Sequence, residues 1–193
     1  SMAPASLTLA ARRLTHTQSI SKETLAQTNP GIYASILQNL QDGMWKTIVT
    51  DYFTTIQSDG VTDIGIATGS TVTYADLVNL EAAIGDLNIG KACYVTTPAL
   101  RAAMKKTAYL TNQAPIWLND VVNGYPAYCT SGELATYITF GDFSKAVVAQ
   151  WGGFEVIVDP FTDAKKGLIN LTIVGMVDTG CYNTRGLANV VIA

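Results

Sequence analysis

The chain has 193 residues, of which 48% are hydrophobic and only 14% are charged, with a net charge of -3 and a pI of about 5.0. An average soluble domain has about 25% charged residues. So few charges exclude a disordered acidic tail and a basic nucleic-acid-binding module. No stretch approaches the roughly 20 apolar residues that a membrane-spanning helix needs. We expect one domain, or a domain with an added lobe, whose uncharged surface is largely covered by something else.

The first 60 residues predict a strand followed by an unusually long helix. Residues 7–21 are rich in Thr and alternate weakly, which favours an extended strand that needs a partner. Ser21 caps a short helical turn through Gln27. Asn29 and Pro30 favour a second helix start, and apolar residues then recur at three- and four-residue steps for about 28 residues, roughly 42 Å. That is far above the mean helix of about 11–12 residues, so we expect the helix to lie across something extended.

The middle of the chain predicts two shorter helices around a buried strand. Residues 61–71 are rich in Gly and Thr, which indicates a hairpin or a loop with short strands. Thr73 and Asp76 have the spacing of a capping box and predict a helix over 74–84. A strand is expected at 92–96 and a third helix at 98–106.

The second half of the chain predicts mostly short strands. Asn123-Gly124 is a hairpin signal between Val121-Val122 and Tyr125, and residues 159–167 form a polar turn. The expected strands are 137–140, 146–150, 154–158, 168–177 and 187–192. Helices in the first half and strands in the second half predict the α+β class.

Candidate chemical groups are sparse. The three cysteines, Cys93, Cys129 and Cys181, lie far apart and are interpreted as reduced thiols. His16 is the single histidine, which argues against His-based triads and multi-His metal centres. We therefore expect no metal, no cofactor and no catalytic residue. One alternative from another class is a hydrolase or transferase that uses Asp142, Ser144 and Lys145.

Four segments, taken in order, resemble the major capsid proteins of tailed bacteriophages, the Hong-Kong-97-type capsid family. Residues 20–25 (ISKETL) before Asn29-Pro30 resemble the entry to that family's spine helix. Residues 94–106 (YVTTPALRAAMKK) resemble its strand, turn and helix, and Ile116-Trp117 with 122–127 (VNGYPA) resembles a later segment. The most specific match is 138–146 (ITFGDFSKA), followed by 151–156 (WGGFEV).

The resemblance implies a fold with a peripheral and an axial domain. The peripheral domain, with the long spine helix and long strands, would comprise residues 5–72 and 141–180. The axial domain would comprise residues 73–140 and 181–193. The loop between the long strands would meet neighbouring subunits at three-fold positions, through Asp159, Pro160, Phe161, Thr162, Asp163, Lys165 and Lys166.

The resemblance also implies a structural, non-enzymatic function: the major capsid subunit of a tailed phage or prophage. Implied partners are further copies in hexamers and pentamers, scaffold, portal and protease, and packaged double-stranded DNA held without sequence recognition; no membrane is implied. The implied location is the virion, and the bacterial cytoplasm during assembly. Compared with the family, an N-terminal arm and an extended hairpin are missing before residue 7. We therefore interpret the chain as shortened and expect a monomer or small rings in dilute solution.

A second interpretation within the same fold is an encapsulin-like compartment shell, which stores a cargo enzyme instead of DNA. Neighbouring genes would separate the two, because terminase, portal and protease genes accompany a phage capsid.

Overall fold

The computed structural model describes residues 7–27, 31–58, 61–65, 72–84, 91–109, 114–132 and 136–192. The chain divides into two compact units. Unit 1 comprises residues 1–8, 50–147 and 179–193, and unit 2 comprises residues 9–49 and 148–178. Each unit has its own sheet.

Unit 2 is built on a three-stranded sheet in the order β1-β8-β7. The predicted N-terminal strand is confirmed as β1 (Arg12–Ser21), and its partner is β8 (Leu168–Cys181). The two strands pair antiparallel from Arg12↔Val177 to Ser21↔Leu168. The third strand, β7 (Ala146–Asp159), follows a 3₁₀ turn, η2 (Phe143–Lys145).

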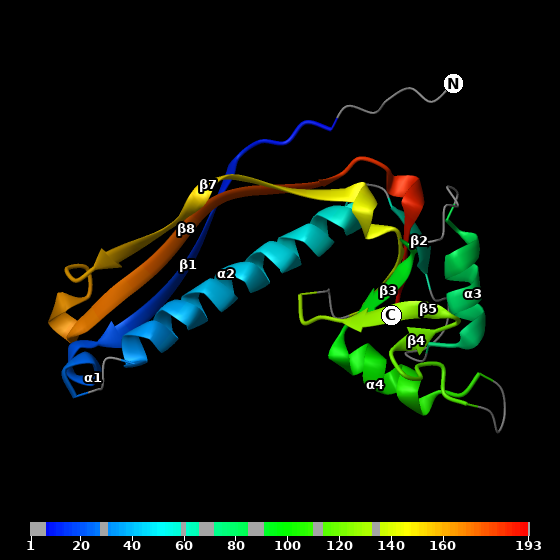
Figure 1. Ribbon diagram of the computed structural model, residues 1–193, viewed down its shortest axis with the longest axis horizontal. Helices are drawn as coiled ribbons and strands as arrows, with labels where there is room; N and C mark the ends of the chain where they lie inside the picture. The colour runs from blue at the N-terminus through cyan, green and yellow to red at the C-terminus, as the bar shows by residue number, and fades with distance from the viewer. Residues whose placement is uncertain are drawn as a thin grey trace. The chain divides into compact units, whose positions relative to one another are not determined.

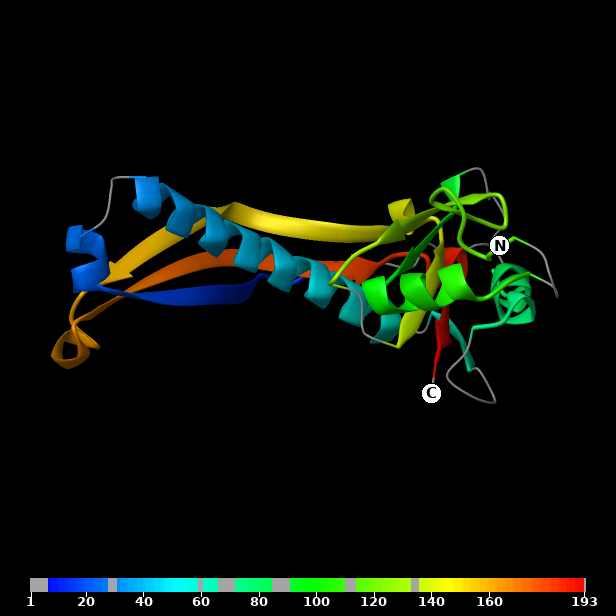
Figure 2. The ribbon, with the colours of Figure 1, turned by 90° about the horizontal axis from the view of Figure 1, so that it is seen from below.

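The predicted long helix is confirmed as α2 (Gly31–Ser58), which has 28 residues. Figures 1 and 2 show the part of the helix within unit 2, residues 31–49, running along one face of the β1-β8-β7 sheet. Its apolar side chains recur at i, i+4 and face the sheet, as an amphipathic helix requires. The core of unit 2 is formed by Ile20, Ile36, Leu40, Met44, Ile48, Leu171, Ile173 and Val177. The short predicted helix is also confirmed, as α1 (Lys22–Gln27), whereas the predicted start at Asn29-Pro30 lies outside the described residues.

Unit 1 contains a six-stranded mixed sheet in the order β2-β9-β6-β3-β5-β4. The β2–β9 and β3–β5 pairs are parallel, and the other pairs are antiparallel. Two helices, α3 (Tyr74–Ala82) and α4 (Pro98–Lys106), contribute buried side chains to the main core of the unit. The strands are β2 (Thr62–Gly65), β3 (Cys93–Thr96), β4 (Val121–Val122), β5 (Tyr125–Cys129), β6 (Tyr137–Gly141) and β9 (Leu187–Val191).

Local sequence signals explain several boundaries in unit 1. The capping box is present, because Thr73 accepts from the Asp76 amide and the Asp76 carboxylate accepts from the Thr73 amide. Thr97 caps α4, and Pro98 occupies the first turn of that helix, where Pro is tolerated. Asn123 and Gly124 both have positive φ, 49° and 87°, the conformation of a tight primed hairpin turn.

One sequence-based expectation is wrong in detail. Residues 146–150 and 154–158 are not separate strands, because β7 continues through Gly152, whose φ of 76° lets the strand bend without ending. Within the predicted hairpin or loop with short strands, residues 62–65 form the short strand β2, which pairs in parallel with the distant β9. The rest of the predicted 61–71 segment lies mostly outside the described residues.

The bounds of the two units differ from those of the predicted domains. Unit 2 ends at residue 49 in α2 and resumes at 148, whereas the expected peripheral domain extends to 72 and resumes at 141. The last part of α2, residues 50–58, therefore belongs to unit 1. Its Ile56 packs with Val61, Cys181 and Leu187 in a second small core. The assignment of peripheral-like and axial-like parts stays a prediction.

Candidate functional site

The predicted interface loop joins β7 to β8 in unit 2. It contains a single 3₁₀ turn, η3 (Ala164–Lys166), and ends at Gly167, which has a φ of 70°. The left-handed conformation at Gly167 reverses the chain into β8. The Gly167 carbonyl accepts from the Lys22 amide at 2.8 Å and so connects the loop to the start of α1.

Asp159 organises the first half of this loop. Its Oδ1 accepts from the amides of Phe161 and Thr162 at 2.9 and 3.2 Å, and its Oδ2 accepts from the Thr162 hydroxyl. Asp is favoured in turns because its side chain makes such local bonds to the backbone. Phe161 is held at the apex of the turn with 83% of its surface exposed.

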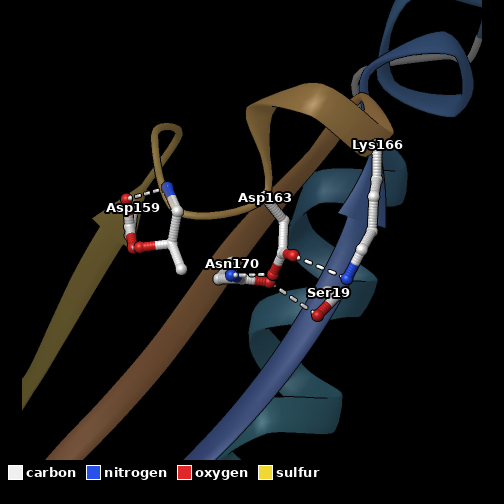
Figure 3. Close-up of polar contacts among 6 residues, drawn as sticks. Ser19, Asp159, Asp163, Lys166 and Asn170 are labelled. Carbon is white, nitrogen blue, oxygen red and sulfur yellow. Dashed lines mark hydrogen bonds and ion pairs between the residues drawn. The ribbon is translucent and has the colours of Figure 1, made fainter.

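Asp163 organises the second half (Figure 3). Its Oδ1 accepts from Lys166 Nζ and its Oδ2 accepts from Asn170 Nδ2, both at 2.9 Å. Asn170 Oδ1 accepts in turn from Ser19 Oγ on β1 at 2.6 Å. The network therefore fixes the loop to two strands of the sheet.

Both loop carboxylates have a lowered pKa. Hydrogen bonds from the Thr162 side chain and then from the Phe161 and Thr162 amides lower the pKa of Asp159. The hydrogen bond from Asn170, and then the contact with Lys166, lower the pKa of Asp163. Hydrogen bonds to the ionised form stabilise that form. These bonds hold the loop in one conformation, in which the exposed ring of Phe161 lies beside charged side chains.

Ser19 and Asn170 are parts of this arrangement that the sequence did not predict. Asn170 interrupts the apolar run of β8, and a lone polar residue next to a loop was the available signal. Ser19 carries no such signal in the Thr-rich β1.

The structure assigns a local structural role to the alternative catalytic group. Asp142 Oδ1 accepts from the Ser144 amide at 3.0 Å and caps η2. Hydrogen bonding from Ser144 lowers the pKa of Asp142. The carbonyls of Ser144 and Lys145 accept from the Tyr182 hydroxyl and amide. Each of these bonds satisfies the backbone of a turn.

Two depressions on the surface of the described residues contain none of the predicted site residues. A depression of about 330 Å³ lies beside Arg101, Trp117 and Asp120, and another of about 390 Å³ lies beside Lys91 and Cys93. The described ranges contain no group of three His, Cys, Asp or Glu side chains that could hold a metal ion. Within these ranges no helix has the length and apolar character to cross a membrane.

The elements described above, among them α2 and the β7-β8 hairpin, can be compared with those of known proteins. The model of the phage capsid family matches residues 5–192. The chain belongs to this family.

Relatives within the phage capsid family and solved structures agree with this assignment. The major capsid protein of Halomonas phage phiHAP-1 is 31% identical over 116 residues, 55% of this chain. The match spans only 19% of that relative. The capsid of an empty GTA particle covers 97% of this chain with a TM-score of 0.74 and 15% identity, and the match spans 74% of the GTA chain. A structure from Gordonia phage Cozz covers 96% with a TM-score of 0.69 and 11% identity, over 71% of its own chain. The two solved structures share the fold of the present chain.

Proposed function

We propose that the chain is the repeating subunit of a phage capsid, the major head protein of a tailed phage or prophage. The observation that carries the proposal is the family match over residues 5–192. The name of the relative from Halomonas phage phiHAP-1, a major capsid protein, supports the same function. The function is structural and non-catalytic, and the chain is part of the virion.

In this proposal the loop of residues 159–166 contacts neighbouring subunits at three-fold positions. An exposed Phe is costly in water and is a typical anchor of protein interfaces. Asp159 and Asp163 hold the loop in one conformation, so little conformational entropy is lost when a neighbour binds. Lys165 and Lys166 lie beside the apolar apex and provide charges for the rim of the contact.

The remaining partners follow from the same proposal. The shell contains hexamers and pentamers of the chain and encloses double-stranded DNA without reading its sequence. Strong phosphate binding needs clustered Lys and Arg, and only 12 of the 193 residues are Lys or Arg. Scaffold, portal and protease act in assembly, which takes place in the host cytoplasm. The encapsulin-like alternative has less support, because the curated relative is a phage protein.

Truncation of Phe161, at the apex of the loop, tests this proposal. Phe161→Ala removes a side chain that is 83% exposed, so we expect the free energy of unfolding to stay within about 0.5 kcal/mol. Particle yield, measured by sedimentation after expression of the complete gene, should fall at least tenfold, as for an interface anchor. Val78→Ala on α3 is the matched control, because it also truncates an exposed apolar side chain. Normal particle yield from Phe161→Ala would contradict the assignment of the loop.

A further inference from the structure

Among the described residues, no strand pairs with the outer edge of β7 in the sheet of unit 2. In the order β1-β8-β7, β7 is the outermost strand on one side, as Figure 2 shows. We define the β7 edge as residues 148–158, all within unit 2. At roughly 3.3 Å per residue this edge is about 36 Å long. Its exposed large apolar side chains are Val148, Trp151, Val156, Ile157 and Val158.

The two edges of this sheet differ in charge. β1 carries Arg12, Arg13 and His16, whereas the β7 edge carries a single charged residue, Glu155. Proteins that keep an edge strand unpaired protect it with charges, Pro or a cover. The β1 edge has such protection, and the β7 edge has neither Lys nor Pro. The β7 edge thus has the composition of a strand that accepts a partner.

On α2, Trp45 also presents exposed apolar surface next to β7. Trp45 is 53% exposed, although its ring meets Phe154 of β7 edge-to-face with centroids 5.8 Å apart. The exposed Trp45 ring thus adds apolar surface beside β7, and exposed apolar patches mark interaction sites. A strand added beside β7 would extend the sheet over α2 and cover this ring.

We propose that the β7 edge pairs antiparallel with the β7 edge of a second copy of the chain, around a local two-fold axis. This deepens the proposed function, on which it rests. Valines flank Gly152 and Gly153 on both sides, with Val148 before them and Val156 and Val158 after them. Two strands reversed about Gly153 set Val148 opposite Val158 at both ends of the edge. A side chain at Gly153 would meet open space, so the centre of the edge allows close approach.

The β1 edge is a worse partner for the β7 edge. Pairing β7 with β1 would place Arg12 and Arg13 against a strand whose single charge is Glu155. Arg12 is already paired with Asp178 at 3.2 Å. Burying a guanidinium without a matching charge costs several kcal/mol, whereas two β7 edges bring no guanidinium into the contact. In the proposed pairing both copies contribute the same strand edge, as the two subunits do in a two-fold interface.

Single-cysteine cross-linking tests this geometry, because only a two-fold pairing brings a residue next to its own copy. In a background with Cys93, Cys129 and Cys181 replaced by Ser, one Cys is placed in turn at Val148, Gln150, Gly153, Glu155 and Ile157. Diamide accepts the two electrons and two protons when two thiols form a disulfide. Thr17→Cys on β1 is the matched exposed control, tested alone and mixed with each β7 variant. The protein is expressed from its complete gene, and dimers are read on non-reducing gels.

We expect dimers to peak at one β7 position near Gly153, at least fivefold above Val148 and Ile157, and Thr17→Cys to give none. Particles with no β7 cross-link, or with cross-links only between Thr17→Cys and β7 variants, would overturn the pairing and leave the proposed function standing. Cross-linked pairs without any shells would support the pairing and contradict the proposed function. Neither particles nor cross-links would overturn both.

Discussion

The imidazole of His16 on β1 lies directly against the backbone of Gly43 in α2. A Cβ at position 43 would lie 2.6 Å from Cδ2 and 2.9 Å from Cε1 of the His16 ring, closer than real Cβ atoms come to other atoms. Both residues belong to unit 2. Gly in a helix interior costs about 1 kcal/mol relative to Ala. The glycine therefore exchanges helix propensity for a close approach of α2 to β1.

A double-mutant cycle measures this relationship. In the presence of His16, Gly43→Ala should be near neutral or destabilising, because the ring must leave its place. In the His16→Ala background, the same change should raise the free energy of unfolding by about 1 kcal/mol, since only the propensity gain is left. Urea denaturation of the four proteins gives the coupling energy, which we expect to be about 1 kcal/mol or more. Equal effects of Gly43→Ala in both backgrounds would refute the contact.

Gly141, in the segment 138–146, lies against the backbone of Gly186 and Leu187. Its φ is 142°, and a Cβ there would overlap the Gly186 carbonyl oxygen and lie 2.9 Å from the Leu187 Cα. Backbone atoms cannot rotate away as a side chain does, so Gly141→Ala should cost at least about 3 kcal/mol. Gly124→Ala is the control, with a φ of 87° but open space around its Cβ, and should cost about 1–2 kcal/mol. The two variants should differ clearly in urea denaturation, and equal losses would show that no obstruction exists at Gly141.

Glu81 connects a buried tyrosine to the β4-β5 hairpin. Its Oε1 accepts from the Tyr94 hydroxyl at 2.6 Å and from Asn123 Nδ2 at 2.7 Å. Tyr94 is fully buried, and its other acceptor, the Leu77 carbonyl, is 3.5 Å away. Glu81→Ala should cost about 2–3 kcal/mol, because it leaves two donors without this acceptor. In Tyr94→Phe the loss from Glu81→Ala should shrink, and strictly additive losses would contradict the shared bond.

The loop carboxylates predict a specific response to acid. The pKa values of Asp159 and Asp163 lie below the ordinary value of 3.8. A lowered pKa in the folded state means that the stabilisation is present above the unfolded-state pKa and is lost as pH falls through the folded value. The loop should thus keep its conformation from pH 7 to about pH 4 and loosen only below that pH. NMR titration of the Asp163 carboxyl should give a midpoint below 3.8, and Asn170→Ala should raise it; an unchanged midpoint would show that Asn170 does not act on Asp163.

Local signals predicted much of the fold. Thr73 and Asp76 predicted a capped helix, and Asn123-Gly124 predicted a hairpin turn, because each motif satisfies backbone groups within a few residues. The 28-residue periodicity predicted α2 for the same reason, since a helix face is set by residues three and four apart.

Contacts between distant parts of the chain could not be predicted in this way. The parallel pairing of β2 with β9 joins residues more than 120 positions apart, and nothing in either short strand specifies the other. The glycine pair in β7 resembled a strand end, yet Gly152 bends the strand and pairing continues. Polar residues 159–167 predicted the turn, but the Ser19–Asn170–Asp163 network needed the pairing of β1 with β8.

Electron microscopy of the particles made when the complete gene is expressed tests the central claim most directly. The account predicts closed shells in which this chain is the repeating subunit, with α2 and the β7-β8 hairpin of every copy visible in the reconstructed wall. Discrete single chains under all assembly conditions, or a shell built from another protein, would contradict it.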